Sequence, residues 1–196
     1  MKIFCATGNP GKLREFQLAG NLLNIDIEPL PDLKSIPAPE ETGATFEENA
    51  RLKAAYYSAF APGPLFADDS GLEVSALNGE PGVYSARYAG ANATDAVNNA
   101  LLLERLQTKT DRTARFVCVI TLAEAGIPGP SFRGEVEGII LHEARGQGGF
   151  GYDPLFYYPP FNCSLSEVGE AEKFVISHRG AALRAMLQYL TNAPSR

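Results

Sequence analysis

A short glycine-containing loop near the start of the chain has the residue types needed to hold a phosphate. Residues 7–12 read TGNPGK and lie between a predicted buried strand, 2–6, and a predicted helix, 11–23. A loop in this position directs backbone N–H groups and the positive end of a helix dipole at an anion. Lys12 adds a full charge and Asn9 an amide donor. The spacing is neither that of a P-loop nor that of a dinucleotide fingerprint, so the loop alone fits phosphate binding and an ordinary Gly-Asn turn equally well.

Four carboxylates, in two adjacent pairs, could bind a metal ion. Glu40 and Glu41 follow a proline-rich connection, and Asp68 and Asp69 end a predicted strand that starts at Leu65. Magnesium takes oxygen ligands and keeps water and substrate phosphates in its shell. Successive strand residues point to opposite faces, so both aspartates can face one site only if the strand has already turned. One could bind metal while the other holds the turn, and the pair alone also fits a structural cap.

A glycine-rich segment in the second half of the chain could recognise a base. Residues 148–154 read GGFGYDP, and the glycines permit close approach of the backbone. Phe150 and Tyr152 could stack on a ring, and Asp153 could accept hydrogen bonds from its edge. Aromatic residues beside glycines are also common as core plugs at a bend.

The segment KFVISHRG, residues 173–180, contains a second candidate. Ser177 is a plausible N-cap, which places His178 and Arg179 in the first turn of the last helix. A cation is unfavourable at that end of the helix dipole, so Arg179 indicates an anion or acceptor nearby. His178 fits a core or capping histidine equally well, and no Ser-His-Asp or Cys-His order is compelling.

The composition bounds the class of protein. The 196 residues predict a single domain, 1–196, and the net charge of -6 argues against a broad nucleic-acid surface but not against a small anionic ligand. Cys5, Cys118 and Cys163 form no CxxC pair, which favours buried reduced thiols. The apolar stretch at the start of the chain is too short, and turns polar too soon, for a signal peptide. No run approaches the ~18 apolar residues of a membrane span. We therefore expect a cytoplasmic protein with neither a nucleic-acid nor a membrane partner.

Helices and strands alternate early in the chain, and two long strands follow. Thr45 and Glu48 form a capping box that starts a helix ending near Pro62, and Thr94 caps a helix that reaches about Leu106. The pattern predicts an α/β fold with a mixed sheet. The other expected segments are a short strand and extended connection in 25–40, a loop in 78–93, strands 114–124 and 131–143 joined around 126–130, a helical turn in 165–174 and a last helix over 177–190.

Six blocks of the sequence, taken together, closely resemble the inosine triphosphate pyrophosphatase family, whose members hydrolyse ITP, dITP and XTP. They keep the family's order and spread over nearly the whole chain, which makes them far more specific than any single block. The proline-rich stretch before Glu40 and the residue Pro10 depart from the family pattern only as ordinary variation. The blocks are TGNPGK (7–12), EETGATFEENARLKA (40–54), ADDSGLEV (67–74), PGVYSARYAG (81–90), GGFGYDP (148–154) and AEKFVISHRG (171–180).

The resemblance implies an elongated two-lobed fold around a mixed β-sheet, a nucleotide cleft between the lobes, a homodimer and Mg²⁺ as cofactor. It implies cleavage to the monophosphate and pyrophosphate. Asp69 matches the proton acceptor for the attacking water, and Glu40 and Asp69 match the magnesium-linked acids. The implied substrate-binding residues are Thr7, Gly8, Asn9, Pro10, Gly11 and Lys12 in the phosphate loop, Lys53 and Lys173 on the triphosphate, Ser70 beside the acid, and Phe150, Gly151, Tyr152, Asp153, His178 and Arg179 in the base pocket.

The chemistry of these residue types agrees with that placement. Attack on a polyphosphate is mainly a problem of charge and alignment, which a metal, several lysines and a water-orienting carboxylate solve. Donors from Arg179 and His178 would suit the 6-oxo group of hypoxanthine or xanthine and mispair with the adenine amine.

Two alternatives stay open. A Maf-type nucleotide pyrophosphatase would act on modified pyrimidines, and the SHR and GFGYD blocks argue against it. A non-catalytic nucleotide sensor would bind ITP without turnover, and the retained acids argue against that.

Overall fold

The computed structural model describes residues 2–22 and 24–192, and it has one mixed seven-stranded sheet in the order β2-β1-β3-β4-β5-β6-β7. β1 runs parallel to both β2 and β3, and the remaining pairs are antiparallel. This is the α/β fold with a mixed sheet that the alternating elements predict. The strands are β1 Lys2–Cys5, β2 Asp26–Pro29, β3 Leu65–Val74, β4 Thr113–Glu124, β5 Ile127–Ile140, β6 Phe156–Tyr158 and β7 Cys163–Ser164.

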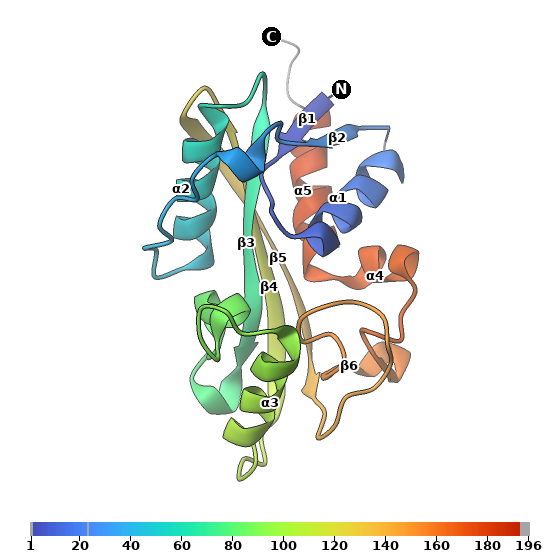
Figure 1. Cartoon of the computed structure of the whole chain (residues 1–196). Coiled ribbons are helices and arrows are strands. Elements are labelled where there is room, and N and C mark those ends of the chain that lie inside the picture. The colour runs from blue at the N-terminus through green and yellow to red at the C-terminus, as the bar shows by residue number, and fades with distance from the viewer. Residues whose placement is uncertain (1, 23, 193–196) are drawn as a thin grey trace.

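Three long strands form the axis of the molecule. Figure 1 shows β3, β4 and β5 running along its length, with α1, α2 and α5 beside one half and α3 beside the other. The short α4 precedes α5 directly. Among the described residues no helix is long and apolar enough to cross a membrane. The helices are α1 Pro10–Leu22, α2 Phe46–Ser58, α3 Asp95–Arg105, α4 Glu170–Ile176 and α5 His178–Asn192.

The half of the sheet beside α1, α2 and α5 is covered by helices on both faces. This explains why the strands there are almost continuously apolar. Phe66 of β3 packs with Phe16 of α1 and Leu183 of α5 in one core cluster. Its neighbour Ala67 packs with Ala54 of α2 in another. Alternate residues of β3 therefore face α1 and α5 on one side of the sheet and α2 on the other.

A further apolar core fills the other half of the molecule. Leu72 of β3 and Leu102 of α3 pack there with Phe116 of β4, Phe156 of β6 and the tyrosine Tyr152. This core gives the segment 148–154 a rigid support on the side away from α1 and α2.

Helix starts agree closely with the capping signals. The Thr45 hydroxyl accepts a hydrogen bond from the Glu48 N–H at 3.2 Å, and the Glu48 carboxylate accepts from the Ala44 N–H at 2.7 Å rather than from Thr45. Thr94 caps α3 by accepting from the Val97 N–H at 3.4 Å. The predicted starts of both helices are confirmed, although α2 already ends at Ser58.

Several predicted boundaries of the long strands are wrong. β3 does not end at Asp69 but continues to Val74, because every residue from 65 to 74 pairs with β4. The loop expected over 126–130 is a two-residue turn at Ala125 and Gly126, whose φ angles are 49° and 83°.

The tight turn lets β5 start at Ile127, and the strand then ends at Ile140, before the predicted residue 143. The loop expected over 78–93 contains a 3-10 helix at Gly82–Arg87. The predicted end of the first helix, Leu23, lies outside the described residues.

Two of the three cysteines are buried free thiols, as expected. Cys5 and Cys118 are fully buried, and Cys163 is half-buried. Burial, together with the charge of Asp68, raises the pKa of both Cys5 and Cys118. Such thiols are protonated and inert at neutral pH.

Candidate functional site

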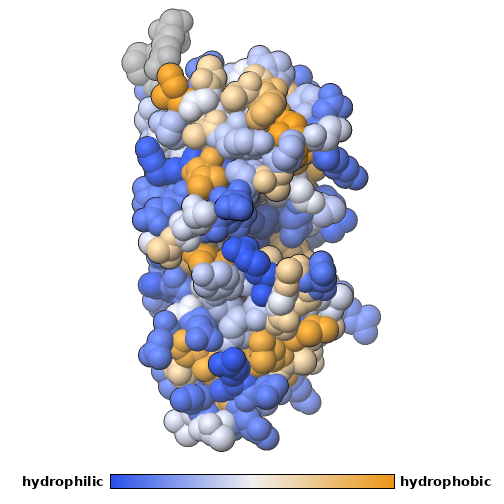
Figure 2. All heavy atoms as spheres, turned by 60° about the vertical axis from the view of Figure 1, so that its left-hand side comes forward, coloured by the Kyte–Doolittle hydropathy of each residue, from blue (hydrophilic) through white to orange (hydrophobic). Residues whose placement is uncertain are grey.

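A pocket of about 200 Å³ lies between the two halves of the molecule and collects residues from distant parts of the chain. Figure 2 shows a recess surrounded by hydrophilic residues about half-way along this face. Of the residues predicted for the site, those lining this pocket are Asn9, Lys12, Lys53, Asp69, Ser70, Phe150, Gly151, Tyr152, Asp153 and Arg179. Those outside its lining are Thr7, Gly8, Pro10, Gly11, Glu40, Lys173 and His178.

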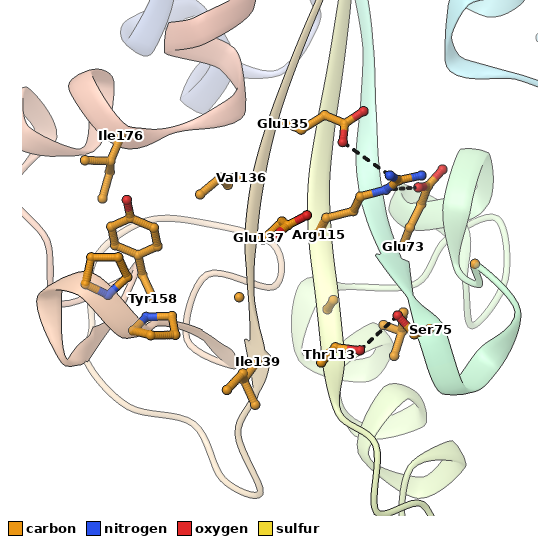
Figure 3. Close-up of a pocket in the computed structure, with 16 residues that line it drawn as sticks. Glu73, Ser75, Thr113, Arg115, Glu135, Val136, Glu137, Ile139, Tyr158 and Ile176 are labelled. Carbon is orange, nitrogen blue, oxygen red and sulfur yellow. Dashed lines mark hydrogen bonds and ion pairs between the residues drawn. The ribbon is translucent and has the colours of Figure 1, made fainter.

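A larger open groove, about 930 Å³, lies on the sheet below this pocket. None of the predicted site residues lines it. Figure 3 shows Arg115 in this groove between Glu73 and Glu135, to which it is bonded at 2.6 and 3.3 Å. Glu137 also lines the groove, so its lining is acidic, and the charge of Arg115 is already neutralised by the other two glutamates. Such a surface does not suit a triphosphate.

The two adjacent aspartates of β3 face opposite sides of the sheet. Asp68 bonds Lys12 of α1 at 2.8 Å, and Asp69 bonds Lys53 of α2 at 2.8 Å. The strand does not turn between them, so the two carboxylates do not share one site. Asp69 lines the pocket, whereas Asp68 reaches it only through Lys12.

The two aspartates also differ in the direction of their pKa shifts. Burial acts to raise the pKa of Asp68, but Lys12 and Lys53 outweigh it, and that pKa lies below its ordinary value. Burial dominates at Asp69, so its pKa is raised despite Lys53. A carboxylate of raised pKa in a pocket is a better proton acceptor than its neighbour and a candidate for acid-base chemistry.

Glu41, rather than Glu40, lines the pocket together with Asp69. Glu40 is exposed, while Glu41 accepts from Lys53 at 3.1 Å and from Arg87 at 3.3 Å. Burial would raise the pKa of Glu41, but the two cations lower it. Lys53 thus lies between Asp69 and Glu41, and these carboxylates more than offset burial, so its pKa is raised.

Carboxylate oxygens are the ligands that magnesium prefers, with water and substrate phosphates completing the shell. No group of three or more His, Cys, Asp or Glu side chains that could hold a metal occurs within residues 2–22 and 24–192. Asp69 and Glu41 supply two such carboxylates on one pocket wall. The donor set fits a magnesium ion that arrives with a polyphosphate rather than a closed structural metal site.

The predicted phosphate loop, residues 7–12, is organised by Asn9. Its Oδ1 accepts from the backbone N–H of Gly11 at 2.8 Å and of Lys12 at 3.2 Å, at the start of α1. Pro10, the first helical residue, has no N–H to satisfy. With its oxygen occupied by the helix, Asn9 keeps its amide hydrogens as donors for a ligand.

The aromatic residues of 148–154 have different roles. Tyr152 is buried and donates its hydroxyl to the Ser85 carbonyl at 2.8 Å, which makes it part of the core. Phe150 is half-buried, with Arg179 4.7 Å and Lys173 5.1 Å from its ring centre. A Cβ at Gly11 would lie 2.7 Å from the Phe150 ring, so the glycine lets the two blocks meet.

Four charged side chains tie α1 to the Phe150 loop and to the start of α5. Asp153 accepts from Lys173 at 2.6 Å and from the Phe150 N–H at 2.8 Å, so one of its oxygens already holds its own loop. Glu15 bonds Lys173 at 2.8 Å and Arg179 at 3.0 Å. Burial opposes ionisation of Glu15, but the two cations lower its pKa.

His178 is buried and stacks on Phe116 of the pocket wall, with ring centres 4.8 Å apart. Among the described residues, neither its ring nitrogens nor Nε of Arg179 has a hydrogen-bond partner. Burial and the charges of Arg179 and Lys173 hold the pKa of His178 well below its ordinary value, so the ring is neutral. Unpaired buried polar atoms are costly, and at a pocket they favour a polar ligand nearby. The predicted cap is confirmed, since Ser177 accepts from the Gly180 N–H at 3.1 Å.

Three residues of this region were not predicted from the sequence. Arg87 belongs to the quoted block 81–90, but its spacing gives no sign that it meets Glu41, 46 residues away. In the sequence Phe116 is one apolar residue among several in a strand, so nothing indicates that it lines the pocket. The only signal for Glu15 is its position one helical turn after Lys12.

Comparisons with known proteins agree over almost the whole length. The Ham1 family model matches residues 3–189. A dITP/XTP pyrophosphatase of Exiguobacterium sibiricum is 51% identical over 193 residues, which are 97% of this chain and 98% of the relative. One from Thermus thermophilus is 50% identical over 196 residues, 99% and 94% of the two chains. A solved HAM1 protein from Coxiella burnetii has a TM-score of 0.88 at 45% identity, covering 98% of this chain and 100% of its own. The Staphylococcus aureus Ham1 protein has a TM-score of 0.85 at 41% identity, covering 97% and 98%.

Proposed function

The chain belongs to the Ham1 family, and from this membership we propose that it hydrolyses dITP, XTP and ITP to the monophosphate and pyrophosphate. The family predicted from the six sequence blocks is thereby confirmed. The relatives named dITP/XTP pyrophosphatase cover nearly the whole chain at about half identity, which supports a hydrolase of the same substrate class.

One observation carries the proposal. Asp69, a carboxylate of raised pKa, faces a pocket that also holds the cations Lys12, Lys53 and Arg179 and the ring of Phe150. A proton acceptor, phosphate-neutralising groups and a ring-stacking surface are the parts that hydrolysis of a nucleoside triphosphate needs. No other described cavity combines them.

Within this pocket Asp69 accepts the proton of the attacking water. Lys12 and Lys53 exchange their carboxylate partners for phosphate oxygens and so neutralise charge that builds on the leaving pyrophosphate. The first N–H groups of α1 are already bonded to Asn9, so the start of the helix favours the same anion through the positive end of its dipole and the free amide hydrogens of Asn9. Asp69 and Glu41 would hold a magnesium ion, which neutralises phosphate charge when bound. The acid Glu40 of the family pattern is exposed, and we assign its place to Glu41.

On the base side, Phe150 stacks on the purine. Arg179 donates to the 6-oxo group, and neutral His178, which lies outside the pocket lining, supports the pocket wall by stacking on Phe116. Asp153 and Lys173 hold the Phe150 loop in place through their 2.6 Å ion pair. An amine at position 6, as in ATP, would leave the donors of Arg179 without an acceptor, which is a penalty in a buried site.

The wider setting is part of the proposal. The nucleotide binds between two lobes, the half with α1, α2 and α5 and the half with α3, and the pocket's position supports this. The homodimer rests on the family resemblance alone, and light scattering of the purified protein tests it. Buried thiols support action in the reducing cytoplasm.

Product analysis of a substrate panel tests the activity. ITP, dITP, XTP, GTP, ATP and modified pyrimidine triphosphates are incubated with the protein and magnesium, and products are separated by ion exchange. We expect pyrophosphate and monophosphate from the deaminated purines. Diphosphate with orthophosphate would refute the proposal, preference for modified pyrimidines would favour a Maf-type enzyme, and binding without turnover would favour a sensor.

A further inference from the structure

A buried amide on α2 lies against the carboxylate of Asp69. Asn49 has no exposed surface, and its Nδ2 is 3.4 Å from Oδ2 of Asp69. Its Oδ1 accepts from the Gly43 N–H at 2.8 Å. An amide has an acceptor at one end and donors at the other, so the bond from Gly43 fixes the donor end toward Asp69.

The helix spacing makes this contact part of a pair. Asn49 and Lys53 are four residues apart on α2 and therefore share one face. Lys53 bonds Oδ1 of Asp69 at 2.8 Å, while Asn49 approaches Oδ2. Each oxygen of the carboxylate thus has one donor from the same helix.

The backbone before α2 is shaped for this arrangement. A Cβ on Gly43 would lie 2.6 Å from Oδ1 of Asn49 and 2.7 Å from Cβ of Glu48, so a larger residue would displace the amide. The Thr45 cap fixes where α2 begins relative to this glycine.

We propose that Asn49 is a positioning residue that fixes the orientation of the Asp69 carboxylate during hydrolysis. The inference rests on the proposed role of Asp69. When a triphosphate draws Lys53 to its phosphates, Asp69 loses its strongest partner, and Asn49 is the donor of α2 that stays. Being neutral, the amide is not drawn toward the anion and lowers the basicity of the carboxylate less than a cation does.

Steady-state kinetics of Asn49→Ala with ITP and saturating magnesium test the proposal. Because Asn49 does not line the pocket, kcat should fall roughly tenfold while KM stays within about twofold. Gly43→Ala should lower kcat in the same way, since it leaves Asn49 in place but pushes its amide aside.

Ser58→Ala is the matched control for a purely structural effect. Ser58 is buried on the same helix, donates to the Ala55 carbonyl at 3.1 Å and accepts from the Gly126 N–H at 3.0 Å. Its variant should lower the melting temperature without changing kcat. A loss of kcat by Ser58→Ala as large as that of Asn49→Ala would overturn the positioning role.

The double variant Asn49→Ala/Asp69→Asn separates this inference from the proposed function. If Asn49 acts through Asp69, the double variant loses no more kcat than Asp69→Asn alone. A normal kcat for folded Asn49→Ala, or a further tenfold loss of kcat in the double variant, overturns the positioning role of Asn49. In either case an inactive Asp69→Asn protein still upholds the proposed function. Near-normal turnover by Asp69→Asn would remove the basis of both.

Discussion

Asp68 and Asp69, neighbours on β3, each hold one lysine of the pocket from opposite faces of the sheet. Asp68 bonds Lys12 at 2.8 Å and Asp69 bonds Lys53 at 2.8 Å. The strand therefore connects the predicted phosphate loop, residues 7–12, with the charged face of α2. The Asp68 side chain is buried and paired with Lys12, whereas Asp69 lines the pocket. Replacement by asparagine should therefore change activity differently at the two positions.

Asp69→Asn should remove most activity while the fold survives, because the two side chains are nearly isosteric. The expected loss is on the order of 100-fold in kcat, the range for removing a general base. Kinetics with ITP and a thermal melt measure the two effects. Near-normal turnover by the folded variant would make Asp69 a structural residue.

Asp68→Asn should mainly weaken substrate binding. The variant leaves Lys12 without its ionised partner, so Lys12 should be placed less firmly for phosphate and KM for ITP should rise severalfold, with kcat changed less than in Asp69→Asn. The same kinetic assay measures it. Loss of kcat in Asp68→Asn alone would show that the roles of the two acids are reversed.

Magnesium removal should abolish turnover reversibly. Asp69 and Glu41 fit only part of a magnesium shell, so the ion should depend on the substrate phosphates and dissociate readily. Pyrophosphate release should stop with EDTA and return when magnesium is added in excess. The melting temperature without nucleotide should change little, and a large drop on chelation would instead indicate a structural metal.

The features of this site that could be predicted from the sequence are those decided by residues close together in the chain. The caps at Thr45 and Thr94 and the turn before Lys12 were predictable, because a cap is decided within four residues. The extent of β3 past Asp69 was not, because its pairing with β4 overrides the local Ser-Gly turn signal.

Long-range contacts account for the other omissions. Glu15 meets Arg179 across 164 positions, and Glu41 meets Arg87 across 46. No local pattern specifies such a meeting. The sequence shows Tyr152 only as an aromatic residue in a glycine-rich segment that could stack on a ring, and the packed core around it shows that its ring is already buried.

Arg112 should be a large contributor to stability that is unrelated to catalysis. It is buried and donates to the carbonyls of Ile140 at 2.6 Å, Leu141 at 2.8 Å and Leu106 at 3.2 Å. Arg112→Met removes all three hydrogen bonds, although the Leu106 carbonyl still accepts from the Lys109 N–H at 3.1 Å. The change should cost about 2 kcal/mol, or about 4–8 °C in melting temperature. Arg133→Met, which removes an exposed arginine of β5, should cost within about 0.5 kcal/mol. Equal melting temperatures for the two variants would contradict this ranking.

His178 should make the protein less stable in mild acid. Its folded pKa lies well below the ordinary value of 6.5, so between the two values the unfolded chain binds the extra proton. Stability from this group is present above about pH 6.5 and is lost as pH falls toward the folded pKa, by up to about 2 kcal/mol at pH 5.

Melting temperatures at pH 7.5 and 5.0 measure this effect. The decrease should be smaller in His178→Gln, which cannot take up the proton. The other histidine, His142, is exposed, and His142→Gln should keep the full decrease. The same decrease in both variants would place the acid sensitivity elsewhere.

Base selection by Arg179 is the most demanding prediction. Arg179 lines the pocket, is held by Glu15 at 3.0 Å, and stands over the ring of Phe150. A lost hydrogen bond to a 6-oxo group should cost about 1–3 kcal/mol in discrimination, so Arg179→Ala should reduce the preference for ITP over ATP roughly tenfold or more. Arg184→Ala is the matched control, because Arg184 lies on the same helix but bonds the Phe174 carbonyl at 2.9 Å.

Guanine also carries a 6-oxo group, so Arg179 cannot explain rejection of GTP. That selection must come from the pocket around position 2 of the purine, where an exocyclic amine without an acceptor would be penalised. The Arg179→Ala protein should therefore lose activity on ITP and GTP by a similar factor and on ATP by much less. Measuring kcat/KM for all three substrates separates the two effects. An equal loss on all three would make Arg179 a phosphate-binding or structural residue, and base recognition would then have to be reassigned to other residues of the pocket.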